Sequence, residues 1–80
     1  MHELALTRDV VAIVCHAAAG RRVHVVTLAV GTESCVAPEA LAFCFDVVAR
    51  GTAAEGARLD IRHADGDDVI VSTMEIEEAA

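Results

Sequence analysis

The chain has 80 residues, enough for one small domain with a core that only just offsets the entropy of the chain. Hydrophobic residues make up 55% of it, but only Phe43 and Phe45 are aromatic, so the core must be built largely from small side chains. The formal net charge is −7 without a single lysine, and six acidic residues but no arginine follow Arg62, which argues against nucleic acid as a partner.

The apolar stretches favour a protein of the cytoplasm. The longest of them, residues 10–19, is interrupted by His16 and is too short to span a bilayer. The opening Met-His-Glu also lacks the basic region that begins a signal peptide. Any disulfide framework would leave one of Cys15, Cys35 and Cys44 unpaired, which favours reduced thiols.

The first half of the chain predicts a helix followed by a strand. Residues 4–19 carry apolar side chains at helical spacing, and Gly20 marks the end of this helix. Residues 21–31 are rich in β-branched side chains, which are typical of a strand. With regular alternation, the buried face of this strand comprises His24, Val26, Leu28 and Val30.

A second helix is predicted between Pro38 and Gly51. Pro38 suits the opening turn of a helix, and the acidic Glu39 suits its positive end. The side chains predicted to be buried are Leu41, Phe45 and Val48, with Cys44 as a further candidate.

The last third of the chain predicts two strands. Residues 57–63 alternate cleanly, with Leu59 and Ile61 on one face. Residues 69–77 form the last strand, and the Asp-Gly turn signal near 64–67 predicts that these two strands form a hairpin. The buried face of the last strand is predicted to contain Ile70, Met74 and Ile76.

The order helix, strand, helix, strand, strand predicts an α+β fold of one domain, residues 1–80. Two helices cover one face of a three-stranded mixed sheet, with a right-handed crossover between parallel strands. Strand order stays open, because the first strand could pair with either of the last two. A small core and a sheet with open edges also lead us to expect a homo-oligomer.

The N-terminus can chelate a metal. The Met1 amine and the His2 amide nitrogen close a five-membered ring, and the His2 imidazole closes a six-membered one. Planar nitrogen donors suit Ni(II) or Cu(II). Glu3 could add a fourth ligand through its amide or carboxylate, or could orient the imidazole. The alternative interpretation is a frayed, solvated terminus.

Several segments together resemble the HypA/HybF family of hydrogenase maturation metallochaperones. The resemblance runs from Met1 to about Ile61 and resumes at residues 66–68, before the closing strand. The segments that carry it are Met1–Leu4, Val36–Leu41, Phe43–Asp46, Arg50–Thr52 and Ala54–Ala57.

This resemblance implies a nickel-binding function. In that family the Met-His-Glu start is the nickel site, which implies that Met1, His2 and Glu3 are the metal ligands here. It also implies that Ni(II) is bound transiently and that the partners are the GTPase HypB and the large subunit of [NiFe]-hydrogenase. In some bacteria the nickel goes toward urease.

The chain departs from the family pattern in one respect. HypA proteins normally carry, between the last two strands, a module in which two Cys-x-x-Cys pairs hold zinc. No such pair exists in this sequence, so we expect no structural zinc, and a hairpin turn near 64–67 in place of the module. The competing hypothesis is a metal-free interaction or regulatory module that binds HypB or a hydrogenase subunit without delivering nickel.

The remaining polar residues favour no catalytic role. His16, His24 and His63 are predicted to have structural or solvent-facing roles, and the acidic residues after Ala64 to form a solvated edge. The sequence has no nucleophile elbow, phosphate loop or plausible triad, and Cys44 is predicted to be a core residue. We therefore do not expect an enzyme.

Overall fold

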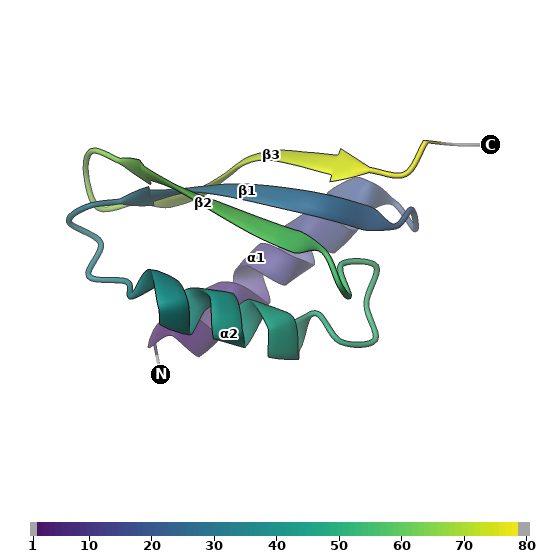
Figure 1. Ribbon diagram of the computed structural model, residues 1–80, viewed down its shortest axis with the longest axis horizontal. Helices are drawn as coiled ribbons and strands as arrows, with labels where there is room; N and C mark the ends of the chain where they lie inside the picture. Colours follow the sequence, from purple (N-terminus) through teal and green to yellow (C-terminus); the bar gives the residue numbers. More distant parts are fainter. Residues whose placement is uncertain (1, 79–80) are drawn as a thin grey trace.

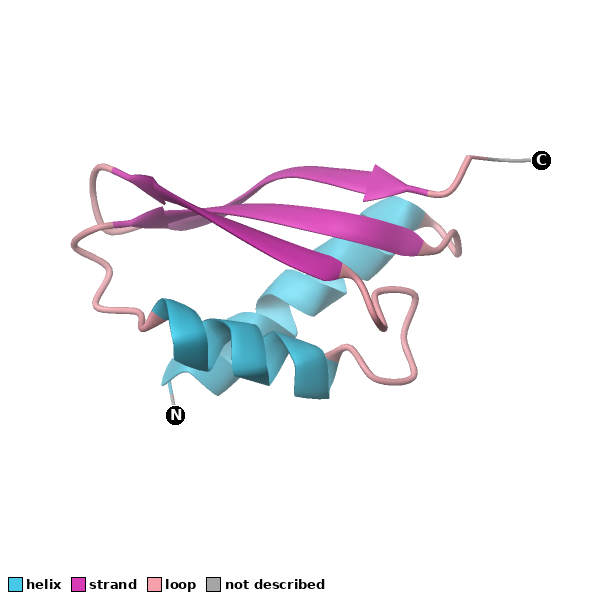
Figure 2. Ribbon diagram, viewed as in Figure 1, coloured by secondary structure: helices cyan, strands magenta, loops and turns pink. Residues whose placement is uncertain are grey.

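Two helices lie on one face of a three-stranded sheet (Figures 1 and 2). The structure is a computed structural model that describes residues 2–78, except for the side chain of His2. The predicted α+β fold is confirmed. Neither helix in the described part of the chain is long and apolar enough to cross a membrane. The elements are α1 (His2–Ala18), β1 (Val23–Gly31), α2 (Pro38–Val48), β2 (Arg58–Ala64) and β3 (Val69–Ile76).

Helix α1 packs through one apolar stripe and ends where the pattern predicts. Its buried residues recur three or four positions apart, which places them on the face toward the sheet and α2. The backbone then turns left-handed at Ala19 and Gly20, with φ of 53° and 87°. Glycine adopts this conformation without steric cost, which explains why the helix stops here. The stripe comprises Thr7, Val10, Val11, Val14 and Ala18.

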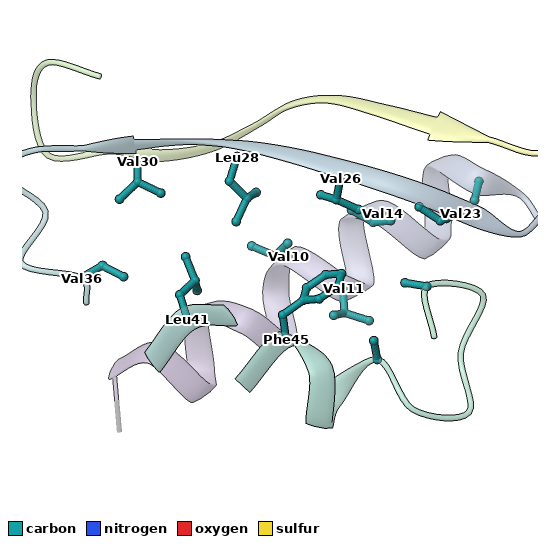
Figure 3. Packing of buried hydrophobic residues seen from close by; sticks show 13 residues of the cluster. Val10, Val11, Val14, Val23, Val26, Leu28, Val30, Val36, Leu41 and Phe45 are labelled. Atoms are coloured by element: carbon teal, nitrogen blue, oxygen red, sulfur yellow. The ribbon is translucent and has the colours of Figure 1, made fainter. Parts of the chain in front are cut away.

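Helix α2 supplies the other half of the helical layer. Pro38 occupies its first turn, where a missing N–H costs nothing. Leu41 and Phe45 are buried as predicted and point from α2 into the layer between helices and sheet (Figure 3). Val48 packs against the same cluster from a half-buried position, while Cys44 is half-buried. Because Phe45 is the only aromatic residue of this cluster, the core consists mainly of valine, leucine and alanine.

Strand β1 lies at the centre of the sheet, between β2 and β3. It pairs with β2 in parallel and with β3 in antiparallel orientation. The predicted hairpin of the last two strands is therefore wrong, because β2 and β3 are not neighbours. The turn signal is correct, but the connection crosses over the end of β1 instead of closing a hairpin.

Three backbone hydrogen bonds fix this crossing. Gly31 N–H donates to Asp68 O, and Thr32 N–H donates to Ala64 O, each at 2.8 Å. Glu33 N–H donates to Gly66 O, also at 2.8 Å. The residues that leave β1 thus pair with the β2–β3 connection, so the polar backbone groups at this end of the sheet are satisfied.

Gly31 has no room for a side chain under this crossing, and its substitution should be costly. A Cβ atom at Gly31 would lie 2.2 Å from Gly66 O, which is backbone and cannot rotate away. We expect Gly31→Ala to lower the free energy of unfolding by about 3 kcal/mol, as measured by urea denaturation. Gly51→Ala is the control, because that position has φ of 76° but open space around it and should lose only about 1 kcal/mol. Equal losses in the two variants would show that the crossing tolerates a side chain.

Two bulges in the β1–β3 pairing change which side chains are buried. The register shifts between Val23 and Val25, so His24 is an extra residue on β1 and points to solvent, while Val23 takes the buried position. The prediction that His24 lies on the buried face is therefore wrong. A second shift places Ser72 as an extra residue on β3. It leaves Ile70 56% exposed, against prediction, and turns the half-buried Val69 and Val71 toward the core.

The two outer strands each pair on one side only. Within the described residues, β2 and β3 contact β1 and leave their other edges unpaired. Unpaired strand edges can join further strands, so the expected homo-oligomer stays a prediction that this topology permits.

Candidate metal site at the start of the first helix

Two of the three predicted nickel ligands, His2 and Glu3, open α1, and the described residues cover the set only in part. Met1 lies outside the described residues. His2 is the first residue of α1, with its side chain likewise outside them. Glu3 is described fully and is half-buried in the first helical turn.

Glu3 joins the start of α1 to the start of α2. Its carboxylate Oε2 accepts a hydrogen bond from the N–H of Ala37, at 3.4 Å, and Ala37 immediately precedes α2. The two helices therefore begin close together, as Figure 1 also shows. This is a contact between residues far apart in the sequence, so it ties the terminus to the body of the fold.

Thr7 holds Glu3 from the other side. The Thr7 hydroxyl donates to the backbone carbonyl of Glu3 at 2.6 Å, one turn earlier in the helix. Thr7 is completely buried and is the single buried polar side chain among the described residues. Thr7 is not among the residues predicted to be buried. Its position on the apolar stripe of α1 nevertheless signals burial, because it lies three, four and seven residues before Val10, Val11 and Val14.

Because His2 is the first residue of α1, its backbone N–H lies outside the hydrogen-bond ladder of the helix. The first four N–H groups of an α-helix have no carbonyl partner within the helix, and the His2 amide is the first of them in α1. This nitrogen can thus lose its proton to a metal without breaking a bond of the helical ladder. The acidic Glu3 in the same turn matches the positive end of the helix.

The other histidines and the acidic residues lie at solvent-exposed positions. His16 and His63 are exposed, and His24 forms an exposed ion pair in which its Nε2 lies 3.6 Å from Oε1 of Glu77. The predicted solvated edge is confirmed, since every acidic residue after Ala64 is exposed. Within residues 2–78, no three His, Cys, Asp or Glu side chains gather closely enough to hold a metal ion.

The three cysteines are free thiols in separate places. Cys15 and Cys44 are half-buried on α1 and α2, whereas Cys35 is exposed in the loop before α2. Cys35 has a φ of 60°, and its Sγ lies 3.8 Å from the carbonyl oxygen of Glu33. Among the described residues, none of the three thiols joins a group of side chains that could hold a metal ion.

His2 and Glu3, which follow Met1 in the sequence, open the first helix of this small α+β domain, and comparisons with known proteins assign the chain to a class of metal-handling proteins. The chain belongs to the HypA family. The family model described as hydrogenase/urease nickel incorporation, metallochaperone, hypA matches residues 1–69. The family is one of metallochaperones and not of enzymes, as the residues predicted.

Individual relatives support the same assignment. The hydrogenase maturation factor HypA of Nostoc sp. is 46% identical over 66 residues, which cover 82% of this chain and 58% of the relative. HypA of Geobacter sulfurreducens is 48% identical over 66 residues, covering 82% and 60%. HypA of Geotalea daltonii is 51% identical over 63 residues, covering 79% and 57%. The chain thus spans a little over half the length of these relatives.

Proposed function

We propose that this protein binds Ni(II) at its N-terminus and delivers it for the maturation of [NiFe]-hydrogenase, with urease as a second candidate destination. The observation that carries the proposal is the placement of His2 as the first residue of α1, in a chain that belongs to a nickel-incorporation family. There the amide nitrogen of His2 is available as a ligand between the Met1 amine and the His2 imidazole.

The chemistry of this donor set suits nickel and its transfer. Amine, amide and imidazole nitrogens form a planar chelate with fused five- and six-membered rings, which Ni(II) accepts well. All three donors must lose protons, so affinity should fall as the pH falls. A planar site at a chain end also stays open above and below, so a partner's ligands can replace its donors one at a time and nickel is held only transiently.

The contacts of Glu3 bear on its role in the site. One carboxylate oxygen accepts the Ala37 N–H, which supports a role for this side chain in holding the first turn. The backbone amide of Glu3 is one candidate for the fourth ligand position. Ligation through the carboxylate remains the alternative, and it would require the Ala37 contact to lengthen.

The same proposal includes the partners and the compartment of the family. HypB and the hydrogenase large subunit are the proposed partners for nickel loading and delivery, in the cytoplasm, with a second copy of this chain as a further candidate. No structural zinc is proposed for these 80 residues, because the sequence has no Cys-x-x-Cys pair. Residues 1–80 act as one nickel-binding domain in which the turn near 64–67 takes the place of the zinc module.

The test compares nickel binding by chains with free and with blocked N-termini. The untagged protein and a protein with an N-terminal extension are titrated with Ni(II) by calorimetry, and their absorption spectra are recorded. The extension converts the Met1 amine to an amide, so we expect the planar site to be lost while far-ultraviolet circular dichroism stays unchanged. Equal affinity and an identical spectrum in the two proteins would refute N-terminal binding.

The second candidate function is a metal-free module that binds HypB or a hydrogenase subunit. The observation that favours it is a pair of exposed apolar side chains on the outer face of α2, where Phe43 is 72% exposed and Val47 is 39% exposed one turn later. Binding of HypB with the same affinity by the free, the nickel-loaded and the blocked chain, together with no nickel transfer, would favour this function.

A further inference from the structure

We infer that Thr7 is a positioning residue for the N-terminal nickel site, because its buried hydroxyl holds the backbone of the residue next to the chelating dipeptide. This inference rests on the proposed function and assigns a role to a residue outside the Met-His-Glu motif. Thr7 touches no metal in this proposal. It acts through Glu3, whose carbonyl oxygen accepts its hydroxyl at 2.6 Å.

Thr7 places a polar hydroxyl group in a core that is otherwise apolar among the described residues. Thr7 is 0% exposed, and the other buried side chains among the described residues are apolar. A hydroxyl taken out of water destabilises the fold unless it is hydrogen-bonded, and valine would fill the same space without that requirement. The bond to Glu3 satisfies the hydroxyl and at the same time fixes the carbonyl of residue 3.

Residue 3 is anchored both within α1 and at the start of α2. Its carbonyl is bound by Thr7 from within α1, and its carboxylate is bound by the Ala37 N–H at the start of α2. Together these contacts set the position and the orientation of the first helical turn. The peptide bond between His2 and Glu3, which contains the Glu3 amide nitrogen, belongs to this turn, and the His2 amide nitrogen lies one residue before it, so the fold holds the backbone beside the proposed ligands.

This anchoring matters because helix ends fray and a planar chelate needs a fixed backbone. Ordering one residue that is otherwise mobile reduces affinity by about tenfold, since the lost conformational freedom opposes binding. A first turn that is already held before the metal arrives avoids this loss. Thr7 therefore contributes to affinity through pre-organisation of the backbone.

A purely structural role for Thr7 makes a different prediction. Threonine in a helix often bonds to the carbonyl four residues before it, without any link to a ligand. In that case its substitution changes the stability of the fold but not the nickel affinity or the nickel spectrum. Affinity and spectrum are therefore the quantities that decide between the two roles.

The test uses the untagged, full chain with Thr7→Val, Thr7→Ser and the control Val14→Ala. Valine keeps the volume of threonine and removes the hydroxyl, serine keeps the hydroxyl, and Val14 is a fully buried residue of the same helix remote from Glu3. We expect Thr7→Val to bind Ni(II) about threefold to tenfold more weakly, with a shifted absorption band, because the first turn is no longer held. Thr7→Ser should stay within about twofold of the wild type, and Val14→Ala should lose stability but keep its nickel affinity.

Hydrogen exchange gives a second measurement on the metal-free protein. Thr7→Val should speed exchange of the amides that bond back into the first turn of α1, and leave those near Val14 unchanged. Wild-type affinity and spectrum in Thr7→Val would overturn the inference whatever the exchange rates, as would an equal loss of affinity in Val14→Ala. A failure of the proposed function would show in a different experiment, because the N-terminal extension would then leave nickel binding by the wild-type sequence unchanged.

Discussion

The His2→Ala variant is expected to bind nickel at least about 100-fold more weakly than the untagged wild type. Alanine removes the imidazole and with it the six-membered chelate ring, which leaves only the amine and the amide nitrogens of the terminus. The fold should be unaffected, because α1 is held by its buried stripe and not by its first residue. Calorimetric titration with Ni(II) and the absorption spectrum of the bound metal measure the change.

Two other histidines serve as matched controls for this variant. His24 and His63 are both exposed on the sheet, and the surface ion pair of His24 with Glu77 contributes little to stability. His24→Ala and His63→Ala should therefore bind nickel like the wild type. If His2→Ala binds as tightly as the wild type with the same spectrum, the site lies elsewhere, and the exposed acidic residues after Ala64 become the next ligands to test.

Replacing Phe45 by alanine is expected to destabilise the protein by about 3 to 5 kcal/mol. Phe45 is only 3% exposed and is the one aromatic residue in the core cluster (Figure 3). The surrounding residues are small and cannot close the cavity that its ring would leave. Because a small domain has a total stability of about 5 to 15 kcal/mol, this loss should show as a large drop in the urea midpoint.

Phe43 is the matched control, since it is the same residue type two positions earlier in the same helix. Its side chain is 72% exposed, so Phe43→Ala should change the free energy of unfolding by no more than about 0.5 kcal/mol. Similar losses in the two variants would mean that α2 packs with a different face toward the sheet. A drop in HypB binding by Phe43→Ala without a loss of stability would support an interaction surface on α2.

The local features of this fold could be predicted from the sequence because each depends on neighbouring residues. Helical spacing of apolar side chains, Pro38 at a helix start and Gly20 at a helix end act over one or two turns of chain. The observed bounds of α1 and α2 agree with these signals. The alternation at Leu59 and Ile61 likewise predicts the half-buried face of β2.

The pairing of the strands could not be predicted in the same way, because it depends on residues far apart in the chain. An Asp-Gly turn reverses the chain whether the next strand lies beside the previous one or on the far side of a third strand. The bulges at His24 and Ser72 arise from the register between β1 and β3, which neither strand encodes alone. Each bulge inverts the alternation beyond it, which is why regular alternation predicts the wrong face for His24 and Ile70.

The candidate site likewise has one part that the sequence predicts and one part that it does not. The Met-His-Glu start is visible in the sequence, because amine, amide and imidazole are consecutive along the chain. The anchors of its first turn are not visible, since Thr7 becomes buried only through packing of α1, and Ala37 reaches Glu3 only through the contact between the two helix starts.

The central position of β1 makes the placement of β2 and β3 independent of the connection between them, while the present connection is itself fixed by its three backbone hydrogen bonds to the residues that leave β1. Both outer strands are held by β1 along their whole paired length, so neither needs the other to keep its place in the sheet. Doubling the length of a flexible loop adds only about 0.6 kcal/mol to its closure free energy. A lineage could therefore gain or lose an entire metal-binding module at this connection while the three strands and the helix start of the nickel site remained unchanged.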